Sequence, residues 1–263
     1  MAFQGTQLKF YWDSVLDDTG ITITGTPTTA NINNALAPTE ISNWQGISTS
    51  PHSLTFDAGA GNVIDADYLS VVGHNLGGST LYVEHSSSTA FVGEHVQISR
   101  IVVPATQTSP IVSEWTTIGG RRAWRLSIHQ GATLSTFAYI SILMLGTRSE
   151  LGYISAPYDP YSQNMHADAN LSQAGYLTGT HIKYVERSMQ ISLRNVSTTI
   201  YEKIKTWWEN HAMNNFVVSW NSTGSTAGNS GDAWLMRSDS IFTNPVSDDY
   251  IRNVEINLIG RKE

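Results

Sequence analysis

Apolar and polar residues alternate in short runs along most of the first 150 positions. In one run Leu54 and Phe56 flank Thr55, and in another Trp124 and Leu126 alternate with polar neighbours. A period of two places successive side chains on opposite faces of a β-strand. Gly, Asn, Ser or Pro interrupt these runs, which predict strands within residues 41–46, 53–59, 67–76, 79–86, 96–103, 122–130 and 137–146. Short strands without a helix among them are typical of a β-sandwich or jelly roll.

One segment in the second half shows helical spacing instead. The positions that share one helix face are Ile200, Ile204, Trp207, Trp208 and His211. Thr199 and Glu202 have the spacing of a capping box, so we expect a helix near residues 199–213. Strand-like segments at residues 181–196, 215–220, 233–243 and 250–260 surround it. The second half therefore predicts a small α+β sandwich with one helix packed on its sheet.

These patterns divide the chain into three parts. Residues 1–150 form the predicted jelly-roll β-sandwich, and residues 177–263 form the predicted β domain with the helix. Between them, residues 151–176 hold Pro157, Pro160 and many small polar residues, with few strand signals. Such a composition is typical of an extended linker or arm. The predicted fold class is mainly β, an N-terminal β-sandwich followed by a small α+β sandwich domain.

The composition fits this architecture. Apolar residues make up 40% of the 263 residues, enough for a core, while charged residues make up only 14%. An ordinary soluble domain has about 25% charged residues. Long exposed helices depend on Glu and Lys, so a weakly charged chain favours β-structure. The formal net charge of −7 argues against a protein that grips nucleic acid through its phosphates.

The sequence also indicates the cellular compartment in which the protein assembles. Cysteine is absent, which excludes disulfides, thiolate metal sites and cysteine nucleophiles. The N-terminus has no charged segment followed by an apolar block, as a secretory signal would. The longest apolar stretch, Phe137–Leu145, falls short of the ~20 residues that span a bilayer. We therefore expect assembly in a cytosol and no membrane insertion.

Candidate catalytic and metal-binding chemistry is sparse. His85 and His95 are ten positions apart on different predicted elements, and the eight histidines show no metal-ligand spacing. The acidic stretch of residues 57–67 lacks the spacing of an EF-hand, so solvated turns are favoured over a calcium site. No nucleophile elbow or phosphate-binding glycine motif occurs, and no carboxylate pair stands out for glycoside hydrolysis. We expect no enzyme activity, no metal and no cofactor.

Eight tryptophans remain to be placed. Exposed aromatic rings that stack on sugars are one means by which β-sandwiches bind carbohydrate. Trp124, Trp220 and Trp234 lie inside strand patterns, which favours core packing. Trp44 and Trp115 lie near predicted turns, so they are the candidate glycan contacts.

Two passages resemble proteins of tailed bacteriophages. Residues 41–88, with a Trp-bearing turn and the segment ADYLSVVGHNL, are similar to the jelly-roll module of tail and baseplate proteins. That module is itself similar to discoidin-type and carbohydrate-binding domains. Residues 175–263 combine a strand, a helix ending in a Trp pair, the strand FVVSW and a closing LIGR. They resemble the ring-forming domain of distal tail and related minor tail proteins, although the order of the two domains is reversed.

The resemblance implies a non-enzymatic structural component of a virion tail tip or baseplate, assembled in the host cytoplasm. Its partners would be further copies in a homo-oligomeric ring and other tail proteins, such as the tube, hub and tape measure proteins. Repeated heterologous contacts that close under cyclic symmetry would build such a ring. An alternative hypothesis is a carbohydrate-binding module that attaches a virion to a host surface glycan. A third is an enzyme acting on polysaccharide or peptidoglycan.

Overall fold

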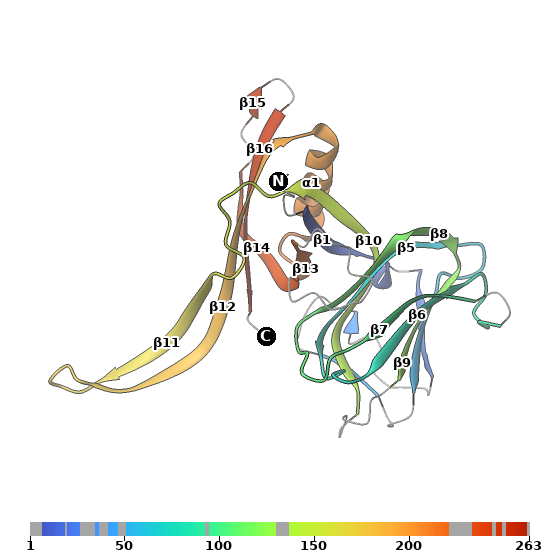
Figure 1. Ribbon diagram of the computed structural model, residues 1–263, viewed down its shortest axis with the longest axis horizontal. Helices are drawn as coiled ribbons and strands as arrows, with labels where there is room; N and C mark the ends of the chain where they lie inside the picture. Colours follow the sequence, from blue (N-terminus) through green and yellow to red (C-terminus); the bar gives the residue numbers. More distant parts are fainter. Residues whose placement is uncertain are drawn as a thin grey trace, which may run out of the picture.

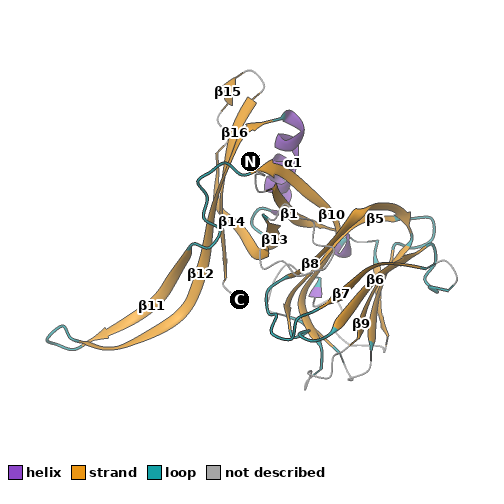
Figure 2. Cartoon of the chain, in the orientation of Figure 1, coloured by secondary structure: helices purple, strands orange, loops and turns teal. Residues whose placement is uncertain are grey.

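The part of the chain that the structure describes is mainly β with one α-helix, as the sequence predicts. The computed structural model describes residues 7–18, 20–26, 35–36, 42–46, 51–92, 95–129, 137–220, 233–243, 246–248 and 251–261. Figure 1 shows three parts: a β-sandwich, a second sheet that carries the helix, and a long hairpin that projects from this second sheet. Figure 2 separates the strands from the single long helix. Among the described residues, no helix is long and apolar enough to cross a membrane.

The sandwich has a five-stranded sheet in the order β2-β4-β9-β6-β7. Its strands are β2 (Thr22–Thr26), β4 (His52–Asp57), β9 (Ala123–His129), β6 (Thr80–Ser86) and β7 (Val96–Val102). The opposite layer consists of β5 (Ile64–His74), β8 (Ile111–Arg121) and β10 (Tyr139–Tyr153), with the short β3 (Trp44–Gln45) paired to β10. Alternate residues of both layers form one buried cluster, with Leu54, Leu81 and Leu126 from the five-stranded sheet and Leu69, Ile111 and Ile140 from the opposite layer.

The layer that contains β5, β8 and β10 continues beyond β10 as the same hydrogen-bonded sheet, through β1, β13, β14, β16 and β12 to β11. We name this continuation the second sheet. Its strands are β1 (Gln7–Ser14), β13 (Phe216–Ser219), β14 (Ala233–Thr243), β16 (Ile251–Arg261), β12 (Leu177–Val196) and β11 (Gln163–Leu171). A 3-10 turn (Val15–Asp17) follows β1, and β15 (Val246–Asp248) pairs with β16. This half of the sheet provides a second apolar cluster separate from that of the sandwich.

The helix α1 (Thr198–His211) covers one face of the second sheet (Figure 1). Its buried side chains are Ile204 and Trp207, and the Trp207 ring lies 4.9 Å from that of Phe10 and 5.1 Å from that of Phe216. The helix confirms the segment predicted near residues 199–213. Its N-cap is Ser197, whose side chain accepts a hydrogen bond from the backbone of Ile200, and not Thr199 as the capping-box spacing predicts.

The first strand departs from the predicted division at residue 150. β1 pairs with β13 on one side and with the second half of β10 on the other. Leu8 and Phe10 belong to the apolar cluster of the C-terminal half. Their partners on β10 and β13 are at least 139 positions away in the sequence, and local alternation carries no information about such partners. At the crossing of β1 and β10, any side chain at Gly146 would collide with the carbonyl group of Asp13.

A buried polar cluster lies where the sandwich meets β1. The Lys9 ammonium is 2.7 Å from a carboxylate oxygen of Glu114, with both side chains less than 10% exposed. The Tyr11 hydroxyl donates to the same carboxylate, and the pKa of Tyr11 is raised well above its usual value by burial and by Glu114. Nearby, Arg148 donates to Glu150 and to the backbone of Asp67. Each buried charge therefore has an opposite charge or a hydrogen-bond partner.

The segment predicted as a linker contains a strand. Residues 151–153 complete β10, and after the cis Ala156–Pro157 bond β11 begins at Gln163 and pairs with the first half of β12. The hairpin formed by residues 163–187, which we name the arm, leaves the sheet and projects away from the rest of the chain (Figure 1). The second half of the segment predicted as a linker or arm is thus a hydrogen-bonded strand.

Candidate binding surfaces

The two predicted glycan contacts both lie in the sandwich, Trp44 fully buried and Trp115 half-buried. Trp44 is fully buried on β3, and its ring centroid is 5.5 Å from that of His52. Trp115 is half-buried, donates from its indole N–H to the Ala66 carbonyl at 2.9 Å, and stacks on Trp124. Trp44 therefore presents no face to a sugar, since a two-residue strand carries it into the core. Trp115 has one ring face occupied by Trp124.

A different group of side chains lies on the outer face of the five-stranded sheet. The strands β7, β6 and β9 run side by side, so cross-strand partners form rows. Tyr82 is opposite Arg100 on one side and Ser127 on the other. The outward residues of these rows, which we name the Tyr82 surface, are Thr80, Tyr82, Glu84, Arg100, Arg125, Ser127 and His129. Their inward neighbours, such as Leu81 and Leu126, are buried.

The Tyr82 surface combines an aromatic ring pair with fixed polar groups. The Tyr82 and His129 rings meet edge to face, with their centroids 4.9 Å apart. Glu84 accepts hydrogen bonds from Arg125 at 2.7 Å and from Ser127 at 3.3 Å. The Arg125 guanidinium also lies 4.2 Å from the centroid of the Phe91 ring. These contacts hold the polar groups in place before any ligand arrives.

Sequence reasoning missed this surface, because its residues are far apart in the chain. Tyr82, Arg100, Ser127 and His129 come together only through the pairing of three strands. The signal available in the sequence is the outward set of each alternating run, such as Tyr82 between Leu81 and Val83. The register that brings these outward sets into line is set by long-range pairing, which a single sequence does not reveal.

The side chains considered for metals serve other contacts. His85 packs against the Trp124 ring, and burial lowers its pKa, while His95 lies 4.0 Å from Glu84. Asp57 accepts from the Gly59 backbone and pairs with Arg122, whose hydrogen bonds hold the pKa of Asp57 below its usual value. In the described part of the chain, no cluster of three His, Asp or Glu side chains has the arrangement of a metal site.

The arm has two different faces. Directly paired residues of β11 and β12 point to the same side, and bulges after His166 and Asn170 keep the alternation of the two strands in step. One side, which we name the apolar arm face, carries Met165, Ala167, Ala169, Leu171, Leu177, Ile182 and Val185, with Thr180 opposite Ala169 and the Gln163–Arg187 pair at its base. The other side, the polar arm face, carries Asn164, His166, Asp168, Asn170, His181, Tyr184 and Glu186. The arm is thus amphipathic although neither face lies on a core.

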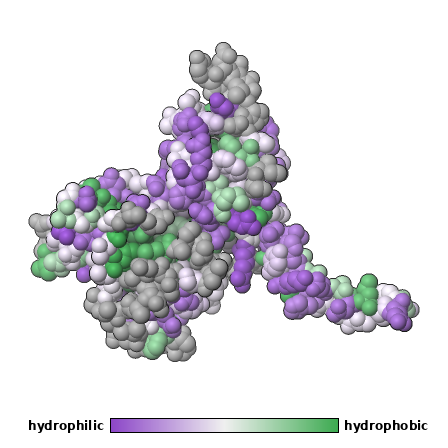
Figure 3. Space-filling view, turned by 180° about the vertical axis from the view of Figure 1, so that it is seen from behind, coloured by the Kyte–Doolittle hydropathy of each residue, from purple (hydrophilic) through white to green (hydrophobic). Residues whose placement is uncertain are grey.

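The polar arm face is organised by side-chain pairs of its own. His166 stacks on Tyr184 with a centroid distance of 4.4 Å and lies 3.8 Å from Glu186. Nearer the tip, Lys183 is 2.9 Å from Asp168. The four largest side chains of the apolar arm face are instead 52–63% exposed. Figure 3 shows apolar side chains on the projecting arm, clear of the body of the molecule.

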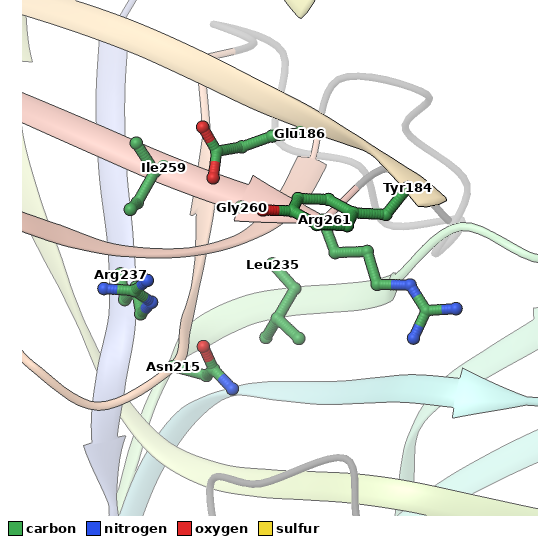
Figure 4. A pocket seen from close by; sticks show the side chains of 8 residues that line it. All are labelled: Tyr184, Glu186, Asn215, Leu235, Arg237, Ile259, Gly260 and Arg261. Carbon is green, nitrogen blue, oxygen red and sulfur yellow. The ribbon is translucent and has the colours of Figure 1, made fainter. Parts of the chain in front are cut away.

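A cavity of about 390 Å³ lies at the base of the arm. Figure 4 shows Tyr184 and Glu186 reaching it from β12, and Arg237 and Arg261 from β14 and β16, with Leu235 on its floor. A side chain at Gly260 would collide with the Leu235 carbonyl, so glycine allows β16 and β14 to approach closely here. With two guanidinium groups and one carboxylate, the cavity has the character of a polar contact site.

Comparison with known proteins concerns the fold alone. No protein-family model and no curated protein sequence matches this chain. Among solved structures, the CBM32 module of AlyQ in complex with 4,5-unsaturated mannuronic acid is 14% identical, with a TM-score of 0.39, over 51% of this chain and 96% of that one. The family 32 module of NanJ from C. perfringens, in complex with galactose, is 13% identical, with a TM-score of 0.40, over 52% and 98%.

A third similar structure, CpGH89CBM32-6 from Clostridium perfringens, is 16% identical, with a TM-score of 0.39, over 51% of this chain and 98% of the module. These structural neighbours are thus carbohydrate-binding modules of one kind. At this level of identity and superposition, the similarity identifies neither a ligand nor a binding residue for this chain. A relationship to tail or baseplate proteins stays a prediction from the sequence passages.

Proposed function

We propose that this chain is a non-enzymatic binding protein whose sandwich takes carbohydrate on the Tyr82 surface. The observation that carries the proposal is the placement of the Tyr82 ring, between Arg100 and Ser127 and against His129, on three neighbouring strands. An aromatic face covers the apolar face of a pyranose ring, while the surrounding donors and acceptors bind its hydroxyl groups. This combination on the outer face of one sheet, with Arg100 and His129 exposed and Tyr82 half-buried, suits a sugar better than an apolar ligand.

The rigidity of the surface supports this proposal. Each of its residues lies on a strand, and Glu84 joins Arg125 and Ser127 in a fixed network. Little conformational entropy is then lost on binding. Hydrolysis of a glycoside by the usual route needs two carboxyl groups about 5–9.5 Å apart. The Tyr82 surface includes a single carboxylate, Glu84, whose Oε2 already accepts from Arg125 and Ser127. With one carboxyl group in this set, the surface is suited to binding and not to bond cleavage.

A printed array of host and bacterial surface glycans tests the proposal, followed by calorimetric titration with any glycan that binds. Replacing Tyr82→Ala removes the stacking ring, and we expect affinity to fall by about tenfold or more, which equals about 1.4 kcal/mol. Tyr153→Ala is the matched control, because Tyr153 is a 64% exposed tyrosine on another part of the molecule. An array without binding, or equal losses in both variants, would refute the proposal.

A second candidate function is favoured by the arm. A structural component of a virion tail tip, joined to neighbours as a ring, needs a surface that reaches beyond its own body. The arm provides such a reach, with a free apolar face at its side. Mass spectrometry of purified virions and labelling of the chain on virion images test this role. Its absence from the tail would refute the role without affecting sugar binding, which belongs to the sandwich.

A further inference from the structure

We propose that the apolar arm face is buried against a second copy of this chain. This contact is independent of the proposed carbohydrate binding by the sandwich, and either proposal can fail without the other. The face is defined by backbone register: Met165 pairs with Val185, Ala167 with Ile182, and Leu171 with Leu177. Paired residues lie on the same side of a ribbon, so these side chains form a row along the arm, with Ala169 and the polar Thr180 between the last two pairs.

The concentration of exposed apolar side chains on the arm is unusual for a surface. Of the fourteen large hydrophobic side chains that are exposed in the described residues, six lie between positions 165 and 184. Apolar residues scattered singly over a surface need no explanation, but a contiguous group marks an interaction site. Met165, Leu171, Leu177 and Ile182, each more than half exposed, lie on the same face of one hairpin.

The arm also needs a contact with another molecule to be stable in its projecting conformation. A two-stranded hairpin is marginal in water unless another layer covers its apolar face. The nine residues of β11 span about 30 Å, and this ribbon projects away from the rest of the chain (Figures 1 and 3). β11 is also the last strand of its sheet, so its outer edge is open to further pairing. An apolar face beside an open edge is suited to a protein surface.

Charge favours a second copy as the occupant. The arm includes two acidic residues, Asp168 and Glu186, and two basic residues, Lys183 and Arg187, so its formal charge is zero. The formal charge of −7 therefore belongs to the rest of the chain. Two acidic bodies repel each other, and an uncharged arm is the part that approaches another copy at the lowest electrostatic cost. A strongly basic partner would need acidic residues at its binding surface. The apolar arm face has none, so its composition does not favour such a partner.

The oligomeric state in solution tests the proposal. We expect the intact chain to form an oligomer, measured by sedimentation velocity over a concentration series. Leu171→Asp places a carboxylate on the apolar arm face and should weaken association by about tenfold or more. Asn170→Asp adds the same charge at the adjacent position but on the polar arm face, and should change association less than about twofold. A melting curve for each variant confirms that the body is folded.

Cross-linking locates the contact, because the chain has no cysteine of its own. Met165→Cys introduces a single thiol for a photo-reactive label, and a cross-link to a residue of a second copy supports the proposal. A monomer at every concentration would overturn it, and so would an oligomer that Leu171→Asp leaves unchanged. Equal weakening by Leu171→Asp and Asn170→Asp would also overturn it, because the effect would then be one of charge and not of the apolar face.

Discussion

The sandwich and the arm are both built from strands with alternating side chains, yet they bury them differently. In the sandwich, the apolar sides of two sheets meet, and Leu126 is fully buried. In the arm, the apolar side of the ribbon meets no second layer, and Leu177 on it is 62% exposed. The comparison shows that alternation marks an amphipathic strand, whereas the topology decides whether the strand's own chain covers its apolar side.

The same contrast holds for ion pairs. Lys9 and Glu114 are buried together where β1 meets the sandwich, while Lys183 and Asp168 pair on the arm with both side chains more than half exposed. Lys9→Met would leave Glu114 buried without its direct ion pair, with the Tyr11 hydroxyl as a neutral hydrogen-bond donor and the Arg148 charge nearby. We expect the free energy of unfolding to fall by about 3–5 kcal/mol. Urea unfolding monitored by tryptophan fluorescence measures this change.

Lys183→Met is the matched control for that change. Water already solvates both members of the exposed pair, so its removal should cost less than about 1 kcal/mol. Equal losses of stability in the two variants would mean that the Lys183–Asp168 pair is covered in solution. The contrast between the buried pair at β1 and the exposed pair on the arm would then be wrong.

Two leucines sharpen the comparison for apolar burial. Leu126→Ala removes a side chain from the sandwich core, and we expect a loss of about 2–5 kcal/mol through lost burial and a remaining cavity. Leu177→Ala on the apolar arm face should change stability by less than about 0.5 kcal/mol. Both are measured by urea unfolding at a concentration where the chain is monomeric. A large loss for Leu177→Ala under those conditions would mean that the chain covers its own arm.

Much of the fold follows from local pattern. The run with Leu54 and Phe56 predicts β4, and the spacing from Ile200 to His211 predicts α1, because side-chain period reports which face is buried. Pairing over long distances does not leave such a mark. The place of β1 beside β13, the rows of the Tyr82 surface and the burial of Trp44 all depend on partners far away in the sequence. The candidate site was therefore not accessible to single-sequence reasoning.

The arm is a second feature that the sequence alone does not reveal. Its strands are polar on one side and flanked by small residues, so residues 151–176 have the composition of a linker. The apolar residues Met165 and Leu171 gain meaning only when β12 supplies Val185 and Leu177 as their partners. An amphipathic ribbon is thus a property of the pair, and neither strand reveals it alone.

Acid is expected to affect the sandwich more than the arm, through a buried histidine. The Nε2 of His74 lies 3.1 Å from the Ser109 carbonyl, and its Nδ1 accepts from the Leu76 backbone. This arrangement requires a neutral ring with the proton on Nε2, and burial lowers the pKa of His74 from 6.5. Below about pH 6.5 the unfolded chain binds more protons than the folded one, so stability falls as the pH decreases.

We therefore expect the free energy of unfolding to decrease between pH 7.5 and 5.5, and His74→Gln to make this decrease shallower. Some dependence should remain in that variant, because burial also lowers the pKa of His85. His181→Gln, on the exposed polar arm face, serves as the matched control because it makes the same substitution far from the sandwich core. Urea titrations at five pH values measure the slopes. Equal slopes for the wild-type chain and His74→Gln would show that protonation of the His74 ring does not limit the acid stability of the sandwich.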